Sequence, residues 1–134
     1  PALAEGRLVI SDRYIDSRFV YQQVTLDGII PEPLSWLRSV HDGWTIMPDL
    51  TILLAVPVSV ALERTGRREN GEHFEQEDVL ARVHEYYMQL VEEDKTRFLI
   101  LDGTLPFEHI LKVAAGAIRH RHEELKKKRT HRKK

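Results

Sequence analysis

Three short apolar segments, separated by stretches with helical periodicity, constrain the fold more than any other feature of this sequence. The segments are residues 8–11, 50–56 and 98–101. Between and after them, apolar residues recur at the three- and four-residue spacing of a helix face. The expected helices cover residues 15–24, 33–42, 58–65, 75–94 and 106–125. Continuous apolar strands alternating with helices are typical of a parallel sheet covered on both faces. The sequence therefore predicts an α/β fold with three layers and three parallel strands.

Length and composition indicate one globular domain. The 134 residues contain no cysteine, which excludes disulfides and thiolate chemistry. No apolar run approaches the roughly 20 residues that a membrane span needs. The first residues show no charged-then-apolar signal pattern. We therefore expect a cytoplasmic protein with no membrane partner and a single domain over residues 1–125.

The last nine residues differ in charge from the rest of the chain. Residues 126–134 carry seven positive charges and no acid, whereas the net charge of the whole chain is −1. We expect this segment to be a disordered basic tail. The remaining body is acidic and has no basic stripe with interleaved aromatic residues. The sequence therefore predicts no nucleic-acid partner.

The first apolar segment ends in Ser-Asp-Arg-Tyr, residues 11–14. Ligands of open α/β sheets bind at the carboxyl edge of the strands, where Asp12 and Arg13 are expected. The planar guanidinium of Arg13 suits a phosphate. Asp12 could hold a hydroxyl group, a metal-bound water or Arg13 itself, and a surface ion pair is the alternative for both residues. Ser17 and Tyr21 follow at a spacing of four residues, on one face of the expected helix.

The order of the motifs resembles the thymidylate kinase family. Asp-Arg-Tyr is followed by Ser17 and by Tyr21-Gln22, and a Pro-Asp-Leu strand at residues 48–50 leads to three arginines. A last strand then ends at Asp102-Gly103. The resemblance implies a parallel sheet of the P-loop nucleoside-monophosphate-kinase type. It also implies a homodimer that transfers the γ-phosphoryl group of ATP to dTMP with Mg2+, giving dTDP for DNA precursor synthesis.

The resemblance also implies roles for particular residues. Arg13 would bind the phosphate of the monophosphate substrate, and Asp12 would help to organise magnesium-bound water, with no direct metal ligand. The catalytic set would be Asp12, Arg13, Arg67 and Arg68. The substrate set would be Arg13, Ser17, Arg18, Tyr21 and Gln22, and the lid set would be Arg64, Arg67, Arg68 and Glu75. Arg18 departs from the family, which usually has a small or neutral polar residue there. Base specificity therefore stays open.

The glycine-rich phosphate loop expected of such an enzyme is not in this sequence. No Gly-x-x-x-x-Gly-Lys-Ser/Thr motif occurs among the 134 residues. In the family this loop follows the first strand, so we expect the chain to lack the first two strands of the sheet. Residues 8–11 should then not pair with residues 50–56, and the chain alone should be inactive as a kinase. The alternatives are a non-catalytic nucleotide-binding or interaction module, and a kinase for another nucleoside monophosphate.

Overall fold

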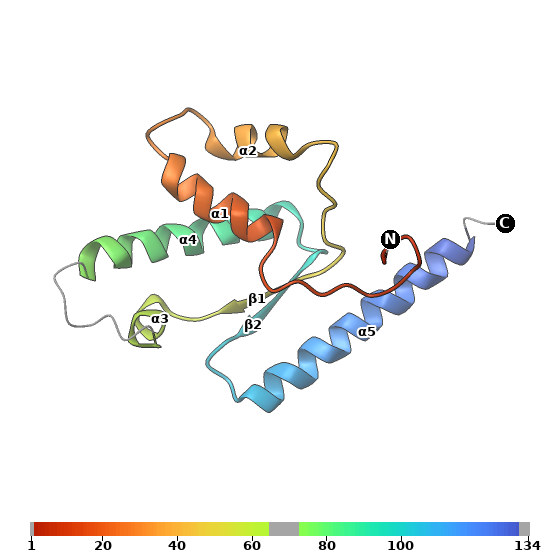
Figure 1. Ribbon diagram of the computed structural model, residues 1–134. Coiled ribbons are helices and arrows are strands. Elements are labelled where there is room, and N and C mark those ends of the chain that lie inside the picture. Colours follow the sequence, from red (N-terminus) through yellow and green to blue (C-terminus); the bar gives the residue numbers. More distant parts are fainter. Residues whose placement is uncertain (1, 65–72, 132–134) are drawn as a thin grey trace.

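The protein is described by a computed structural model that covers residues 2–64 and 73–131. Helices and strands alternate along it, as Figure 1 shows. The elements are α1 (Ile15–Leu26), α2 (Pro33–His41), β1 (Thr51–Ala55), α3 (Val58–Arg64), α4 (His73–Glu93), β2 (Phe98–Asp102) and α5 (Phe107–His131). Each begins and ends within a few residues of the expected bounds, except at the end of α5.

The sheet consists of β1 and β2, which pair in parallel. The register joins Thr51 to Phe98 and continues to Ala55 opposite Asp102. Parallel neighbours need a crossover connection, which α3 and α4 provide. Figure 1 shows α1, α2 and α4 grouped on one side of the strands and α5 on the other. The α/β class with parallel strands is confirmed.

The prediction of a strand at residues 8–11 is wrong. The segment is extended but joins no ladder in the described part of the chain, and the side chains of Leu8, Val9 and Ile10 are exposed. A β-branched segment becomes a strand only when a neighbour pairs with its backbone groups, and none of the described residues does so. The expectation that residues 8–11 would not pair with β1 is met.

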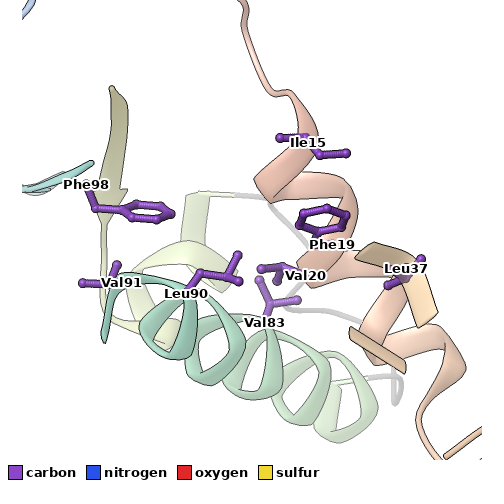
Figure 2. Packing of buried hydrophobic residues seen from close by; sticks show 8 residues of the cluster. All are labelled: Ile15, Phe19, Val20, Leu37, Val83, Leu90, Val91 and Phe98. Carbon is purple, nitrogen blue, oxygen red and sulfur yellow. The ribbon is translucent and has the colours of Figure 1, made fainter. Parts of the chain in front are cut away.

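The hydrophobic core lies between α1 and α4. Figure 2 shows Val20 of α1 close to Val83 and Leu90 of α4. Ile15, Phe19, Leu37, Val91 and Phe98 complete the buried cluster. The α1 and α4 positions fall at helical spacing, so each helix presents one apolar face to the other. This packing fixes the orientation of α1, the helix that follows the Asp-Arg turn.

The last helix does not end where the basic segment begins. Helix α5 continues past Leu125 to His131, so residues 126–131 are helical rather than disordered. Lysine and arginine are good helix formers, and cations near a helix C-terminus interact favourably with its dipole. Lys126 also pairs with Glu123 one turn earlier. None of the helices described is long and apolar enough to span a membrane.

Candidate functional site

Arg13 occupies a strained turn just before α1. Its φ angle is 59°, in the left-handed region that side chains with a Cβ rarely adopt. The Ser11 hydroxyl donates to the carbonyl oxygen of Arg13 at 2.9 Å and supports this turn. The guanidinium carbon of Arg13 lies 5.3 Å from the centre of the ring of Tyr21, which follows the first residue of α1 by six residues. Strained backbone of this kind clusters at functional sites, which makes the turn a candidate for ligand contact.

The pKa of the Arg13 guanidinium is raised, first by its interaction with Tyr21 and least by the charge of Asp12. Arg13 is therefore a permanent cation whose main neighbour is an aromatic ring rather than a carboxylate. Asp12 itself is exposed on the turn. The alternative of a surface ion pair between the two is not what the structure shows for Arg13.

Ser17 faces α4 from the first turns of α1. It is buried, and its hydroxyl oxygen accepts a hydrogen bond of 3.0 Å from the hydroxyl of Tyr87. Burial raises the pKa of Tyr87, so this phenol stays protonated as a donor. The position of Tyr87 fits the apolar face of α4 and by itself indicates core packing. No local signal distinguishes such a tyrosine from a packing residue, and only the fold brings it 70 residues back to Ser17.

Arg18 meets α2 instead of α4. Its Nη1 lies 3.3 Å from Nε2 of His41, the last residue of α2. Nδ1 of the same ring lies 2.8 Å from the carbonyl oxygen of Leu37. The ring is buried, stacks on Trp44 at 5.0 Å between centres, and meets the edge of Phe19 at 5.5 Å. No pattern in the sequence connects His41 with Arg18, because 23 residues separate them.

An open pocket of about 570 Å3 lies between these groups. The whole predicted substrate set lines it, namely Arg13, Ser17, Arg18, Tyr21 and Gln22. The other lining residues are Tyr14, Ile15, His41, Trp44 and Thr45. The lining thus has two arginines, several aromatic rings and no carboxylate. Such a pocket suits an anionic ligand with a planar group.

Helix α1 is held in place by a buried ion pair. Asp16 accepts hydrogen bonds from both terminal nitrogens of Arg97, at 2.7 and 2.9 Å. Thr51, at the start of β1, donates to Asp16 at 2.7 Å and accepts from Arg97 at 2.9 Å. Both charged side chains are nearly buried, with 6% and 12% of their surface exposed. The network fixes the start of α1 against both strands, and with it the position of the pocket residues.

Arg64 is the one predicted lid residue whose side chain the structure describes, and it does not line this pocket. Arg64 donates from Nη2 to the carbonyl oxygen of Gly103 at 3.0 Å, and so ties the end of α3 to the end of β2. Arg67, Arg68 and the Glu75 side chain lie outside the described residues. The described part of the chain has no group of three or more His, Asp or Glu residues placed to hold a metal ion.

The family model and the similar proteins that match this chain indicate the same family. The sequence model described as thymidylate kinase matches residues 1–113. A probable thymidylate kinase of Methanospirillum hungatei is 78% identical over 129 residues, which cover 96% of this chain and 63% of that protein. Proteins of the same name from Methanoculleus marisnigri and Methanocorpusculum labreanum are 53% and 50% identical, each over 89% of this chain and about three fifths of their own length. The chain thus spans about three fifths of these curated relatives.

Proposed function

Since this chain belongs to the thymidylate kinase family, we propose that its pocket binds dTMP, the acceptor of the phosphoryl group. The observation that carries the proposal is the convergence of Arg13, Ser17, Arg18, Tyr21 and Gln22 on one pocket without a carboxylate. A dianionic phosphate would enter such a site without like-charge repulsion. In this proposal Arg13 binds the phosphate, as a charge-assisted donor beside the aromatic face of Tyr21.

The sugar and the base are assigned to the remaining residues. The Tyr21 ring is half-exposed at the pocket and is proposed to pack against the sugar where a 2′-hydroxyl would lie. This contact favours the deoxy form. Arg18 and Gln22 are proposed to meet the base edge, with Ser17 held beside them by Tyr87.

We propose the reaction with the phosphoryl donor, ATP, for the whole protein and not for this chain alone. There the γ-phosphoryl group of ATP passes to dTMP and gives dTDP for DNA precursor synthesis, with Mg2+ bound to the nucleotide. The residues described here do not fit a site for Mg2+ or for the phosphates of ATP, since they form no metal-binding group and the sequence has no phosphate-loop motif. The proposal for this chain is therefore restricted to the acceptor, with Asp12 beside Arg13 acting through water. We further propose a cytoplasmic homodimer, which light scattering after gel filtration can check.

A kinase for another nucleoside monophosphate is the second candidate, and Arg18 is the observation that favours it. The guanidinium lines the pocket and presents only donors. It therefore matches carbonyl oxygens and opposes an exocyclic amine. Thymine and uracil remain good matches, whereas cytosine is a poor one.

Calorimetric titration of the chain with dTMP, thymidine and the ribonucleotide form of thymidine monophosphate tests the proposal. We expect dTMP to bind at least about tenfold more tightly than thymidine, because loss of the phosphate removes a charged hydrogen bond. The ribonucleotide should bind more weakly than dTMP because of Tyr21, and Tyr21→Ala should remove that difference. Equal affinity for dTMP and thymidine would show that the pocket does not recognise the phosphate.

A further inference from the structure

We propose that His41 is a positioning residue that holds Arg18 in the pocket while leaving its positive charge uncompensated. The inference rests on the proposed function, because it gives Arg18 a task towards dTMP. It starts from one contact, between Nη1 of Arg18 and Nε2 of His41 at 3.3 Å.

The hydrogen bonds of the ring fix its protonation. Nδ1 of His41 lies 2.8 Å from the carbonyl oxygen of Leu37, which can only accept, so Nδ1 carries the proton. Arg18 can only donate, so Nε2 must offer a lone pair to it. The two contacts are satisfied together only by the neutral imidazole with its proton on Nδ1. His41 thus acts as an uncharged acceptor for a guanidinium.

Several arginines in the described part of the chain have a carboxylate as partner, whereas Arg18 has an imidazole. Arg97 pairs with Asp16 at 2.7 Å, and Arg38 and Arg82 pair with Glu93 and Asp27. Each of these carboxylates cancels the charge of its arginine. A neutral imidazole orients the guanidinium without cancelling its charge. Arg13, whose guanidinium lies over the Tyr21 ring, also has a neutral neighbour in the same pocket.

His41 is itself held rigidly. The ring is 7% exposed, stacks on Trp44 and meets the edge of Phe19. Arg18, by contrast, is an exposed residue on a flexible stem. An exposed arginine loses rotamer freedom when it binds a ligand, and a fixed acceptor removes part of that cost in advance. The affinity for a ligand that uses Arg18 should therefore depend on His41, although His41 need not touch the ligand.

A double-mutant cycle with dTMP as the probe separates positioning from simple packing. The variants are Arg18→Ser, His41→Phe and the double substitution. Phenylalanine keeps an aromatic ring between Phe19 and Trp44 but has no acceptor for Arg18. We expect Arg18→Ser to weaken dTMP binding about tenfold, since a charged hydrogen bond is lost. His41→Phe should cause most of the same loss, and the double variant should be no weaker than Arg18→Ser alone.

A conservative variant provides the rescue. In His41→Gln the amide oxygen can replace Nε2 as acceptor, so dTMP affinity should stay within about twofold of the wild type. Two results would overturn the proposal: wild-type affinity in His41→Phe, or losses that multiply in the double variant. Multiplying losses would mean that His41 supports the pocket independently of Arg18.

Nuclear magnetic resonance of the unliganded chain gives a readout that needs no substrate. We expect the ring nitrogens of His41 to show the neutral form protonated on Nδ1 at pH 7.5. Rotation of the Arg18 guanidinium should be slow in the wild type and in His41→Gln, and fast in His41→Phe. If no variant binds dTMP, the proposed function fails, but these spectra still decide the inference. An Nε2-protonated ring, or slow rotation in His41→Phe, would contradict it.

Discussion

The two arginines of the pocket are held by different means. Arg13 sits in a left-handed turn with its guanidinium over the Tyr21 ring, whereas Arg18 is bonded to His41 across two helices. Neither guanidinium has a carboxylate as its main partner, so both arginines bring positive charge to the pocket lining. Ligand recognition by this pocket is expected to depend on these individual side chains, so single substitutions can test it.

Replacing Arg13 by alanine should selectively weaken recognition of the phosphate. A lost charge-assisted contact costs about 1.5–3 kcal/mol, or roughly ten- to hundredfold in affinity. Calorimetry should show this loss for dTMP and almost none for thymidine. Arg7→Ala is the matched control, because Arg7 is exposed and pairs with Glu5 away from the pocket lining. In a complete enzyme, Arg13→Ala should impair the use of dTMP far more than the binding of ATP. Unchanged dTMP affinity would remove Arg13 from the site.

Replacing Arg18 by serine should change the ranking of the bases. With Arg18 present, the thymidine and deoxyuridine monophosphates should bind better than the deoxycytidine form, because the guanidinium matches carbonyl oxygens and not an amino group. Arg18→Ser should narrow this difference, and Arg7→Ser should leave it as it is. Competition titrations with the three monophosphates measure the ranking. A ranking that does not respond to the substitution would mean that Arg18 does not meet the base.

Among the elements, α1 carries most of the pocket and depends on its anchor to the strands. The buried pair of Asp16 and Arg97 joins its first turn to β1 and β2, and α4 covers its apolar face. Burial lowers the pKa of Arg97, but its interactions with Asp16, and to a lesser extent with Asp94, outweigh burial and raise the pKa above its ordinary value. The guanidinium therefore stays charged and needs its partner.

Asp16→Ala should destabilise the fold by about 3 kcal/mol, at the lower end of the range for a broken buried ion pair. The lower end is expected because Asp94 lies 3.4 Å from Arg97 and offsets part of the loss. Replacing both partners with apolar residues, Asp16→Leu with Arg97→Met, should recover much of the stability. Urea unfolding provides the measurement. Glu92→Ala, which breaks the exposed pair with Lys95, is the control and should cost well under about 1 kcal/mol. An equally small loss for Asp16→Ala would contradict the anchoring role.

The junction after β2 leaves no space for a side chain at Gly103. A Cβ there would lie 2.7 Å from Cγ1 of Val56 and 3.3 Å from the carbonyl oxygen of Ala55. Because valine is stiff, Gly103→Ala should destabilise the protein by about 1–3 kcal/mol. Gly116→Ala is the matched control, since nothing lies within 4 Å of its added Cβ, and a helical alanine should stabilise α5 by up to about 1 kcal/mol. Thermal unfolding should show opposite signs for the two variants, and equal signs would argue against the close contact.

At the scale of the whole molecule, the proposed dTMP pocket does not by itself provide the groups that phosphoryl transfer requires. Phosphoryl transfer depends on groups that position the β- and γ-phosphates of the donor. The sequence contains no phosphate-loop motif, and the described residues form no metal-binding group.

The purified 134-residue chain should therefore bind dTMP but transfer no phosphoryl group from ATP. The measurement is the transfer of a labelled phosphoryl group from ATP to dTMP in the presence of Mg2+, with a complete thymidylate kinase as the positive control. Transfer above the background of a heat-denatured sample would refute this prediction. Binding without transfer would also fit the alternative of a nucleotide-binding module, so the complete protein must then be assayed.

The sequence by itself determined the local structure. The helical period of the apolar residues located five helices, because that period records which face of a helix is buried. Continuous apolar segments located both strands of the sheet. The Asp-Arg-Tyr turn and the four-residue spacing of Ser17 and Tyr21 were also enough to predict residues that line one pocket. Their roles towards a ligand stay predictions.

Contacts between distant segments were decided only by the tertiary structure. Residues 8–11 have the composition of a strand but lack a pairing neighbour among the described residues, and composition does not report neighbours. Arg64 bonds to Gly103 because the crossover brings α3 beside the end of β2, and its lid role stays a prediction. Tyr87 and His41 join the site because α4 and α2 pack on opposite parts of α1. Such contacts depend on how helices pack in three dimensions, which no local pattern of residues encodes.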